Sequence, residues 1–197
     1  MSQFELMVTA VSIVIGLGVA QILAAFVELI RARRVLQLDW MPITWAVVIL
    51  VLHIQFFFGM YSLDQARPLT ATDFVAIMVL AVLLFMAGGL ILPSVKGSEN
   101  LTTLLEDFDQ DGRLALVPFA LSSALGIALN AKNQAFLDGG GFFAGLLSAG
   151  VLLNTILMLC VVGVLISRRR GIQNALTLAY TALFVFAIFA VWARPGA

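Results

Sequence analysis

The only histidine in the chain, His53, lies in the middle of a long uncharged stretch. Residues 42–62 contain no side chain that carries a formal charge at pH 7. At about 1.5 Å per residue, a helix over this stretch is ~31 Å long, close to the thickness of a bilayer's hydrocarbon core. A titratable side chain at the centre of a membrane span is a candidate functional group, because a charge there is costly. Gln55 follows two residues later and is included in the same candidate site.

The residues around His53 limit the chemistry that it can perform. Haem held by two histidines is excluded, because there is no second histidine. A zinc site needs several His, Cys or carboxylate ligands, and none is expected at this depth. Glu5 and Glu28 are expected near opposite surfaces, so neither extends a proton relay from His53. We expect a neutral imidazole that hydrogen-bonds to another helix; the alternatives are a proton relay, a ligand or a gate.

Other polar side chains also fall inside apolar stretches. Asn154 lies near the middle of the fifth stretch, at a depth similar to that of His53, and Gln21 lies in the first. Because unpaired polar groups are unfavourable in hydrocarbon, they are expected to pair across helices, with Asn154 the first and Gln21 the second expected partner of His53. Interhelical packing is the commoner use of such groups, and a polar substrate path is the rarer one. The candidate intramembrane polar site consists of Gln21, His53, Gln55, Asn154 and Tyr180.

Residues 107–112, Asp-Phe-Asp-Gln-Asp-Gly, match the first half of an EF-hand calcium loop. The bidentate glutamate that closes such a site is replaced by Pro118. A solvated acidic loop is therefore expected rather than a metal site. The sequence also contains neither the G-x-S-x-G pattern of hydrolases nor the H-E-x-x-H pattern of zinc proteases. We predict no catalytic residue, no metal and no cofactor, and expect that the protein is not an enzyme.

Composition places these residues in a membrane protein. The 197 residues are 62% hydrophobic and 11% charged, whereas soluble domains carry roughly 25% charge. The net charge is zero, so no basic field exists that would favour nucleic acid. Cys160 is the only cysteine, which excludes an intrachain disulfide.

Six apolar stretches predict an all-α polytopic protein, a single bundle of transmembrane helices. Thr72 is expected to cap the third of them, with Asp73 in its first turn. Gly16, Ala20 and Ala24 recur every four residues in the first, as on a close-packing helix face. The expected spans are residues 4–30, 41–63, 73–92, 114–135, 142–167 and 175–192.

A short amphipathic helix at the membrane surface is expected between the third and fourth spans. The spacing i, i+3, i+4, i+7 places its apolar residues on one face. These apolar residues are Leu101, Leu104, Leu105 and Phe108.

Basic residues predict the orientation. Eight of the 11 lysines and arginines fall in the loops after the first, third and fifth spans. The positive-inside rule places these loops in the cytoplasm and both termini in the periplasm. The eight residues are Arg31, Arg33, Arg34, Lys96, Arg113, Arg168, Arg169 and Arg170.

The segment FELMVTAVSIVIGLGVAQIL…RARR, followed by W…W…HIQFFFGMYSL, resembles a group of small bacterial inner-membrane proteins of unassigned function. These often begin FEL, carry a GLG stretch followed by Gln or Thr, then have a basic turn and an H-x-Q-aromatic second span. The resemblance covers roughly residues 4–63 and implies no activity.

From these observations we expect a non-enzymatic accessory, sensing or assembly subunit of the inner membrane. It would pack in the lipid bilayer with itself or with a partner complex. The main alternative is a small channel or transporter whose polar path runs near Gln21, His53, Gln55 and Asn154. An intramembrane enzyme that uses His53 is a further alternative.

Overall fold

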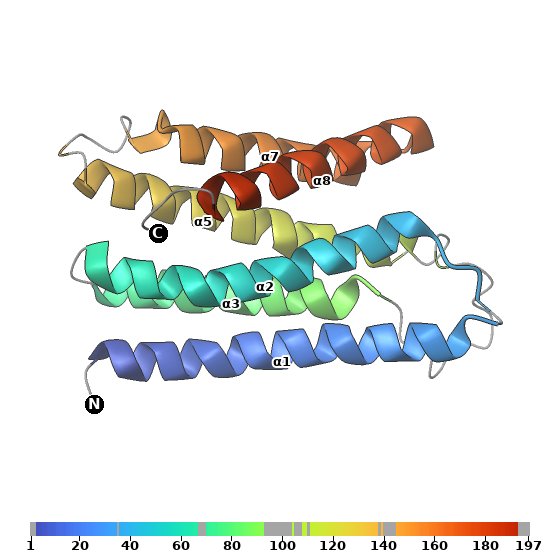
Figure 1. The fold of residues 1–197 in the computed structure, drawn as a ribbon, viewed down its shortest axis with the longest axis horizontal. Coiled ribbons are helices and arrows are strands. Elements are labelled where there is room, and N and C mark those ends of the chain that lie inside the picture. Colours follow the sequence, from blue (N-terminus) through green and yellow to red (C-terminus); the bar gives the residue numbers. More distant parts are fainter. Residues whose placement is uncertain are drawn as a thin grey trace.

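The computed structural model is a bundle of helices, and six of them are long and apolar enough to cross a membrane (Figure 1). The structure describes residues 3–34, 36–66, 70–92, 104, 108–109, 111–137, 139 and 145–192. All regular elements within these ranges are helical, which confirms the all-α class. They are α1 (Gln3–Ala32), α2 (Trp40–Ala66), α3 (Ala71–Leu90), the 3₁₀ turn η1 (Gly112–Ala115), α5 (Leu116–Leu137), α7 (Ala149–Ile166) and α8 (Arg170–Trp192).

The start of α3 is fixed by a capping box. Thr70 is the N-cap: its hydroxyl accepts from the backbone N–H of Asp73, and the Asp73 carboxylate accepts from the backbone N–H of Thr70 at 3.0 Å. The prediction that Thr72 caps this helix is wrong. The reciprocal pattern needs an acidic or amide side chain three residues after the cap; Thr70 has Asp73 there, whereas Thr72 is followed by Val75.

Two helices begin at other residues than the sequence pattern suggests. α7 begins at Ala149 rather than 142, because the N-cap Ser148 is extended, at φ −62° and ψ 144°. Residues 142–144 lie outside the described part of the chain. α8 begins at Arg170 rather than 175. The first turns of α8 are polar, so a hydropathy pattern places the start of this helix too late in the sequence.

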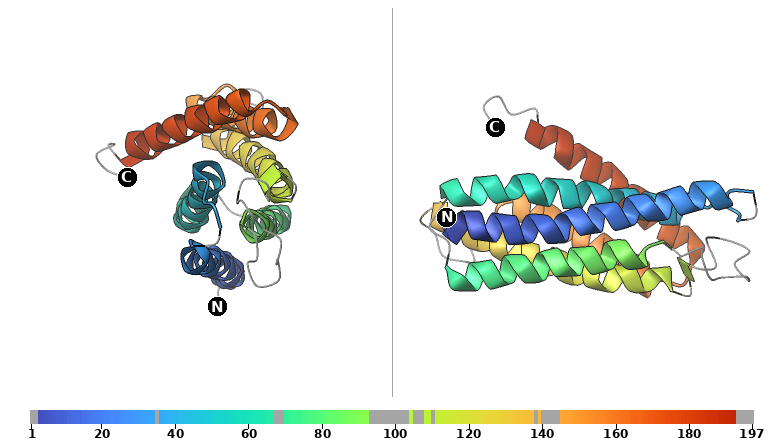
Figure 2. Two further views of the ribbon diagram at one scale, coloured as in Figure 1. Left: turned by 90° about the vertical axis from the view of Figure 1, so that its right-hand side faces the viewer. Right: turned by 90° about the horizontal axis from the view of Figure 1, so that it is seen from below.

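The helices form a closed circuit of neighbours. α1 packs on α3, α3 on α5, α5 on α7 and α7 on α8, while α2 packs on α1, α3 and α8. Figure 2 shows α1 and α8 at opposite edges of the bundle, with α8 crossing obliquely over its neighbours. This arrangement leaves one side of α1 without a helix against it.

Apolar and aromatic side chains fill the interior between α2, α5 and α8. The Trp45 ring lies 6.0 Å from that of Phe119 and 4.9 Å from that of Tyr180, between ring centroids. Tyr180 and Phe184 stack at 5.8 Å. The Trp45 indole N–H donates to Thr177 Oγ1 at 3.2 Å, which joins α2 to α8.

The predicted surface helix falls largely outside the described residues, which include neither Leu101 nor Leu105. Two described residues of its apolar face, Leu104 and Phe108, are fully buried in the main core cluster. The backbone N–H of Leu104 donates to Gln37 O at 3.0 Å. These residues therefore pack into the bundle, and the surface helix itself stays a prediction.

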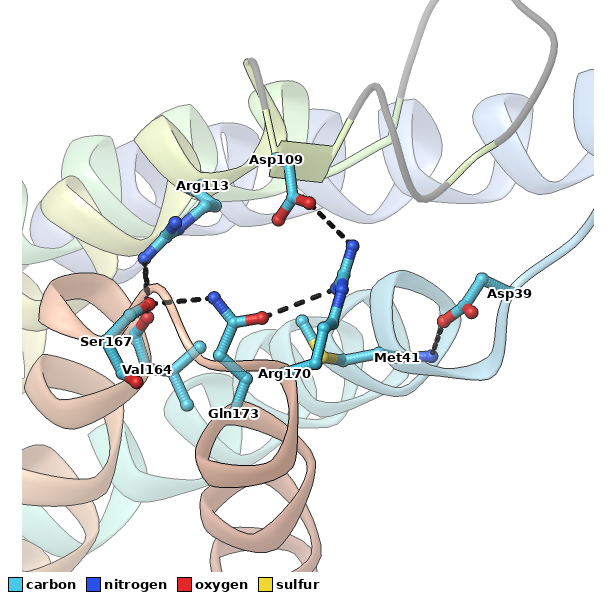
Figure 3. Close-up of polar contacts among 8 residues, drawn as sticks. All are labelled: Asp39, Met41, Asp109, Arg113, Val164, Ser167, Arg170 and Gln173. Atoms are coloured by element: carbon cyan, nitrogen blue, oxygen red, sulfur yellow. Dashed lines mark hydrogen bonds and ion pairs between the residues drawn. The ribbon is translucent and has the colours of Figure 1, made fainter.

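Arg113 of η1 holds the C-terminal end of α7 (Figure 3). Its Nη2 donates to the carbonyl oxygens of Val164 at 3.0 Å, Leu165 at 2.7 Å and Ser167 at 2.6 Å. The last carbonyls of a helix have no partner within the helix, so a guanidinium here satisfies them and complements the helix dipole. These hydrogen bonds link η1, which directly precedes α5, to the end of α7.

The turn from α7 to α8 is held by a second set of contacts (Figure 3). Gln173 is buried, and its Nε2 donates to Ser167 O at 2.8 Å. Arg170 donates to Gln173 Oε1 at 3.4 Å and forms an ion pair with Asp109 at 2.6 Å. The arginines of this turn therefore lie at the same end of the bundle as Arg113.

Candidate functional site

His53 lies midway along α2 and is fully buried. Its Nδ1 is 2.8 Å from the backbone oxygen of Ile49. Because a carbonyl oxygen only accepts hydrogen bonds, Nδ1 carries the proton and donates it, and Nε2 of the neutral ring is a bare acceptor. No hydrogen-bond partner of Nε2 is found among the described residues. The ring is thus fixed on one side by its own helix and unpaired on the other.

The unpaired edge of the ring faces Gly18 of α1. A Cβ atom at residue 18 would collide with His53 Nε2 and would lie 2.8 Å from Cδ2. Glycine has a hydrogen in that direction instead, so the Nε2 lone pair meets a Cα–H group. The imidazole therefore packs directly against the backbone of α1.

Two glycines of α3, Gly88 and Gly89, lie against side chains at the same level of the bundle. A Cβ atom on Gly88 would lie 2.9 Å from Ile22 Cδ1 and 3.4 Å from His53 Cε1. A Cβ atom on Gly89 would lie 2.5 Å from the amide Nε2 of Gln21. We call this layer the glycine layer; it consists of Gly18, Gln21, Ile22, His53, Gly88 and Gly89. In this layer α1, α2 and α3 approach one another through the three glycines.

The glycine layer contains two of the five predicted site residues, Gln21 and His53. Gln21 is exposed at the outer edge, with its amide over Gly89 and not bonded to His53. Gln55 is half-buried on α2 and does not bond to His53 Nε2. Residues two positions apart point to different sides of a helix, which explains the separation of Gln55 from His53.

The predicted hydrogen bond between His53 and Asn154 is wrong. Asn154 is exposed on α7, which packs on α5 and α8. Similar depth in two spans gives no information on which helices are neighbours. Tyr180 lies apart from His53 too, buried in the aromatic cluster with Trp45, Phe119 and Phe184.

The buried ion pair of Asp73 with Lys132 was not predicted from the sequence. The Asp73 side chain is 2% exposed and pairs with Lys132 Nζ of α5 at 2.8 Å. Thr70 Oγ1 also donates to Asp73, at 2.7 Å. The signal available in the sequence was the Thr70-x-x-Asp73 capping pattern, which marks a helix start. It gives no indication of the lysine on α5.

The chemistry open to this layer is narrow. No group of three His, Cys, Asp or Glu that could hold a metal ion occurs among the residues that the structure describes. Asp109, from the acidic loop, pairs with Arg170, and Asp107 lies outside the described ranges. The group able to react is His53 Nε2, whose lone pair can accept a proton.

No family model, curated protein or solved structure matches this chain.

Proposed function

We propose that this chain is a non-enzymatic multi-pass protein of the bacterial inner membrane, an accessory, sensing or assembly subunit that packs laterally with itself or with a partner complex. The six apolar helices of the described residues support a position in a membrane. The observation that carries the role is the uncovered side of α1.

The uncovered side of α1 contains the small residues that the sequence predicted to form a close-packing helix face. Gly16, Ala20 and Ala24 are all exposed, and among the described residues no atom outside α1 lies within 4 Å of a Cβ built on Gly16. Small residues at this spacing let a second helix approach closely in lipid, where packing rather than the hydrophobic effect drives association. The stripe therefore serves a contact with a helix from another polypeptide.

Polar side chains on the outer surface support the same role. Gln21 lies beside the stripe on α1, and Asn154 is exposed on α7. Lipid tails offer neither donors nor acceptors, so an outward-facing amide in a span favours association with another helix that can bond to it.

The basic clusters support the proposed orientation. Arg113 contacts Ser167, and Arg170 contacts Asp109, so the η1 and α7–α8 regions share one end of the bundle. The end of α1, with Arg31, lies at the same end (Figure 1). This end would face the cytoplasm and the termini the periplasm.

The channel or transporter alternative has no observation in its favour. Its path would connect Gln21, His53, Gln55 and Asn154, but His53 is closed in by glycine contacts and Asn154 is on the outer surface. We therefore do not propose it as a second function.

Cross-linking in native membranes tests the proposal. Ala20→Cys in a Cys160→Ala background should give a disulfide-linked dimer if the partner is a second copy. A photo-reactive amino acid at the same position should give a heavier adduct if the partner is another protein. Phe186→Cys, on the 66% exposed side chain of α8, is the matched control. Absence of any adduct at residue 20, or equal yields at residues 20 and 186, would refute lateral packing through α1.

A further inference from the structure

We infer that His53 is a proton-binding site that controls the contact of α1 with α2 and α3. α1 stays in place while Nε2 is bare, and the contact loosens when Nε2 takes up a proton. This inference does not depend on the proposed lateral assembly.

The geometry leaves no room for the added proton. It would point from Nε2 at the Cα of Gly18, which offers no acceptor. The ring is not free to turn away, because Nδ1 is held by Ile49 O at 2.8 Å and Cε1 lies against Gly88. A buried donor without an acceptor is unfavourable, and a buried charge more so. Separation of α1 from the ring relieves both.

The charged and titratable groups of the neighbouring helices do not compensate for that charge. On α1, the described ones are Glu5, Glu28 and Arg31; Glu28 is the nearest to Gly18, at roughly 15 Å along the axis. On α3, Asp73 lies about 22 Å from Gly88 along the helix axis. It is also paired with Lys132. Tyr180 of α8 meets α2 at Trp45, about 12 Å from His53 along the helix.

The other contacts of the glycine layer make α1 respond as a whole helix to the protonation of His53. The Ile22 contact with Gly88 and the Gln21 contact with Gly89 also lie between α1 and α3. Displacement of α1 from His53 loosens both of these contacts. Protonation of His53 alone therefore loosens all the contacts of α1 in the glycine layer.

The test measures the distance between α1 and α3 and the protonation of His53 in the same sample. Spin labels are placed at Leu23→Cys on α1 and Val82→Cys on α3, both exposed side chains, in a Cys160→Ala background in liposomes. ¹⁵N NMR of the single labelled histidine reports its protonation. Between pH ~7.5 and pH ~4.5, which brackets the ordinary titration of histidine, we expect the distance to increase by several ångströms as the ring becomes protonated.

The control variants keep the test decisive. His53→Gln should show the neutral-pH distance at both pH values, and His53→Asn replaces it if the glutamine variant does not fold. Gly18→Ala should show the longer distance at both. The inference is overturned by a ring that protonates without a change in distance, by the same change in the His53 variants, or by a ring that stays neutral at pH ~4.5 in the folded protein.

Discussion

His53 Nε2 lies so close to Gly18 that the Cβ atom of any other residue at position 18 would collide with it. The two residues are therefore matched across the interface of α1 and α2. The edge of the imidazole fits against α1 because residue 18 has no side chain. The consequences of this pairing are measurable in the stability of the bundle.

Gly18→Ala should destabilise the fold by about 1–3 kcal/mol, because the obstacle is a fixed ring and one of the helices must shift. Gly150→Ala on α7 is the control, with open space around the same change, and should alter the free energy of unfolding by less than ~0.5 kcal/mol. Reversible unfolding in mixed micelles measures both. Equal losses for the two variants would contradict the packing of His53 on residue 18.

Gly88→Ala should cost less, about 1 kcal/mol, because the new methyl meets the flexible end of Ile22. Ile22→Val removes that end and should compensate in part. In a double-mutant cycle, the combined loss of stability should be smaller than the sum of the single losses by at least ~0.5 kcal/mol. Simple additivity would show that the two residues do not touch.

Thr177→Val should destabilise the bundle by about 1–2 kcal/mol, because it leaves the buried Trp45 N–H without its acceptor. Thr155→Val is the control: its hydroxyl bonds only to the Val151 carbonyl of its own helix, at 2.8 Å. Tryptophan fluorescence during unfolding follows both variants. A loss at Thr155 as large as that at Thr177 would contradict the assignment.

Lys132→Met should weaken the link between α3 and α5, because it removes the ion pair between the Lys132 ammonium and the buried Asp73 carboxylate. The half-exposed lysine limits the loss to about 1–2 kcal/mol. Adding Asp73→Asn to Lys132→Met should restore part of the stability, and Lys132→Arg alone should keep most of it. A double variant less stable than Lys132→Met would argue against the ion pair as the cause.

Orientation can be tested with two exposed positions at opposite ends of the bundle, Thr72 and Arg169. In a Cys160→Ala background and cells with a permeabilised outer membrane, an impermeant maleimide should label Thr72→Cys. Arg169→Cys should be labelled only after the inner membrane is disrupted. The reverse pattern would mean that the basic end faces the periplasm.

The helices could be predicted from the sequence because long apolar runs fix helix length and number. Their packing could not. α2 and α7 are apolar on all sides, so no polar face reveals which residues point inward. Asn154 was accordingly expected inside the bundle, although it is exposed.

The candidate site was predictable only in part for a related reason. His53 stands out as a lone titratable group, but Gly18 and Gly88 resemble any other small residue in a span. The regular stripe of Gly16, Ala20 and Ala24 lies on the exposed side of α1 and gives no indication that Gly18 meets His53. Which glycine lies opposite which side chain depends on how three helices are aligned along their axes, and a single sequence carries no direct signal for that alignment.

Arg113 and Ser167 are 54 positions apart in the chain, which sets an order of events during synthesis. The guanidinium is made before α5, but the carbonyls that it holds exist only once α7 is complete. The link between η1 and the end of α7 can therefore form only after α7 has been made, although it joins two segments that are distant in the sequence.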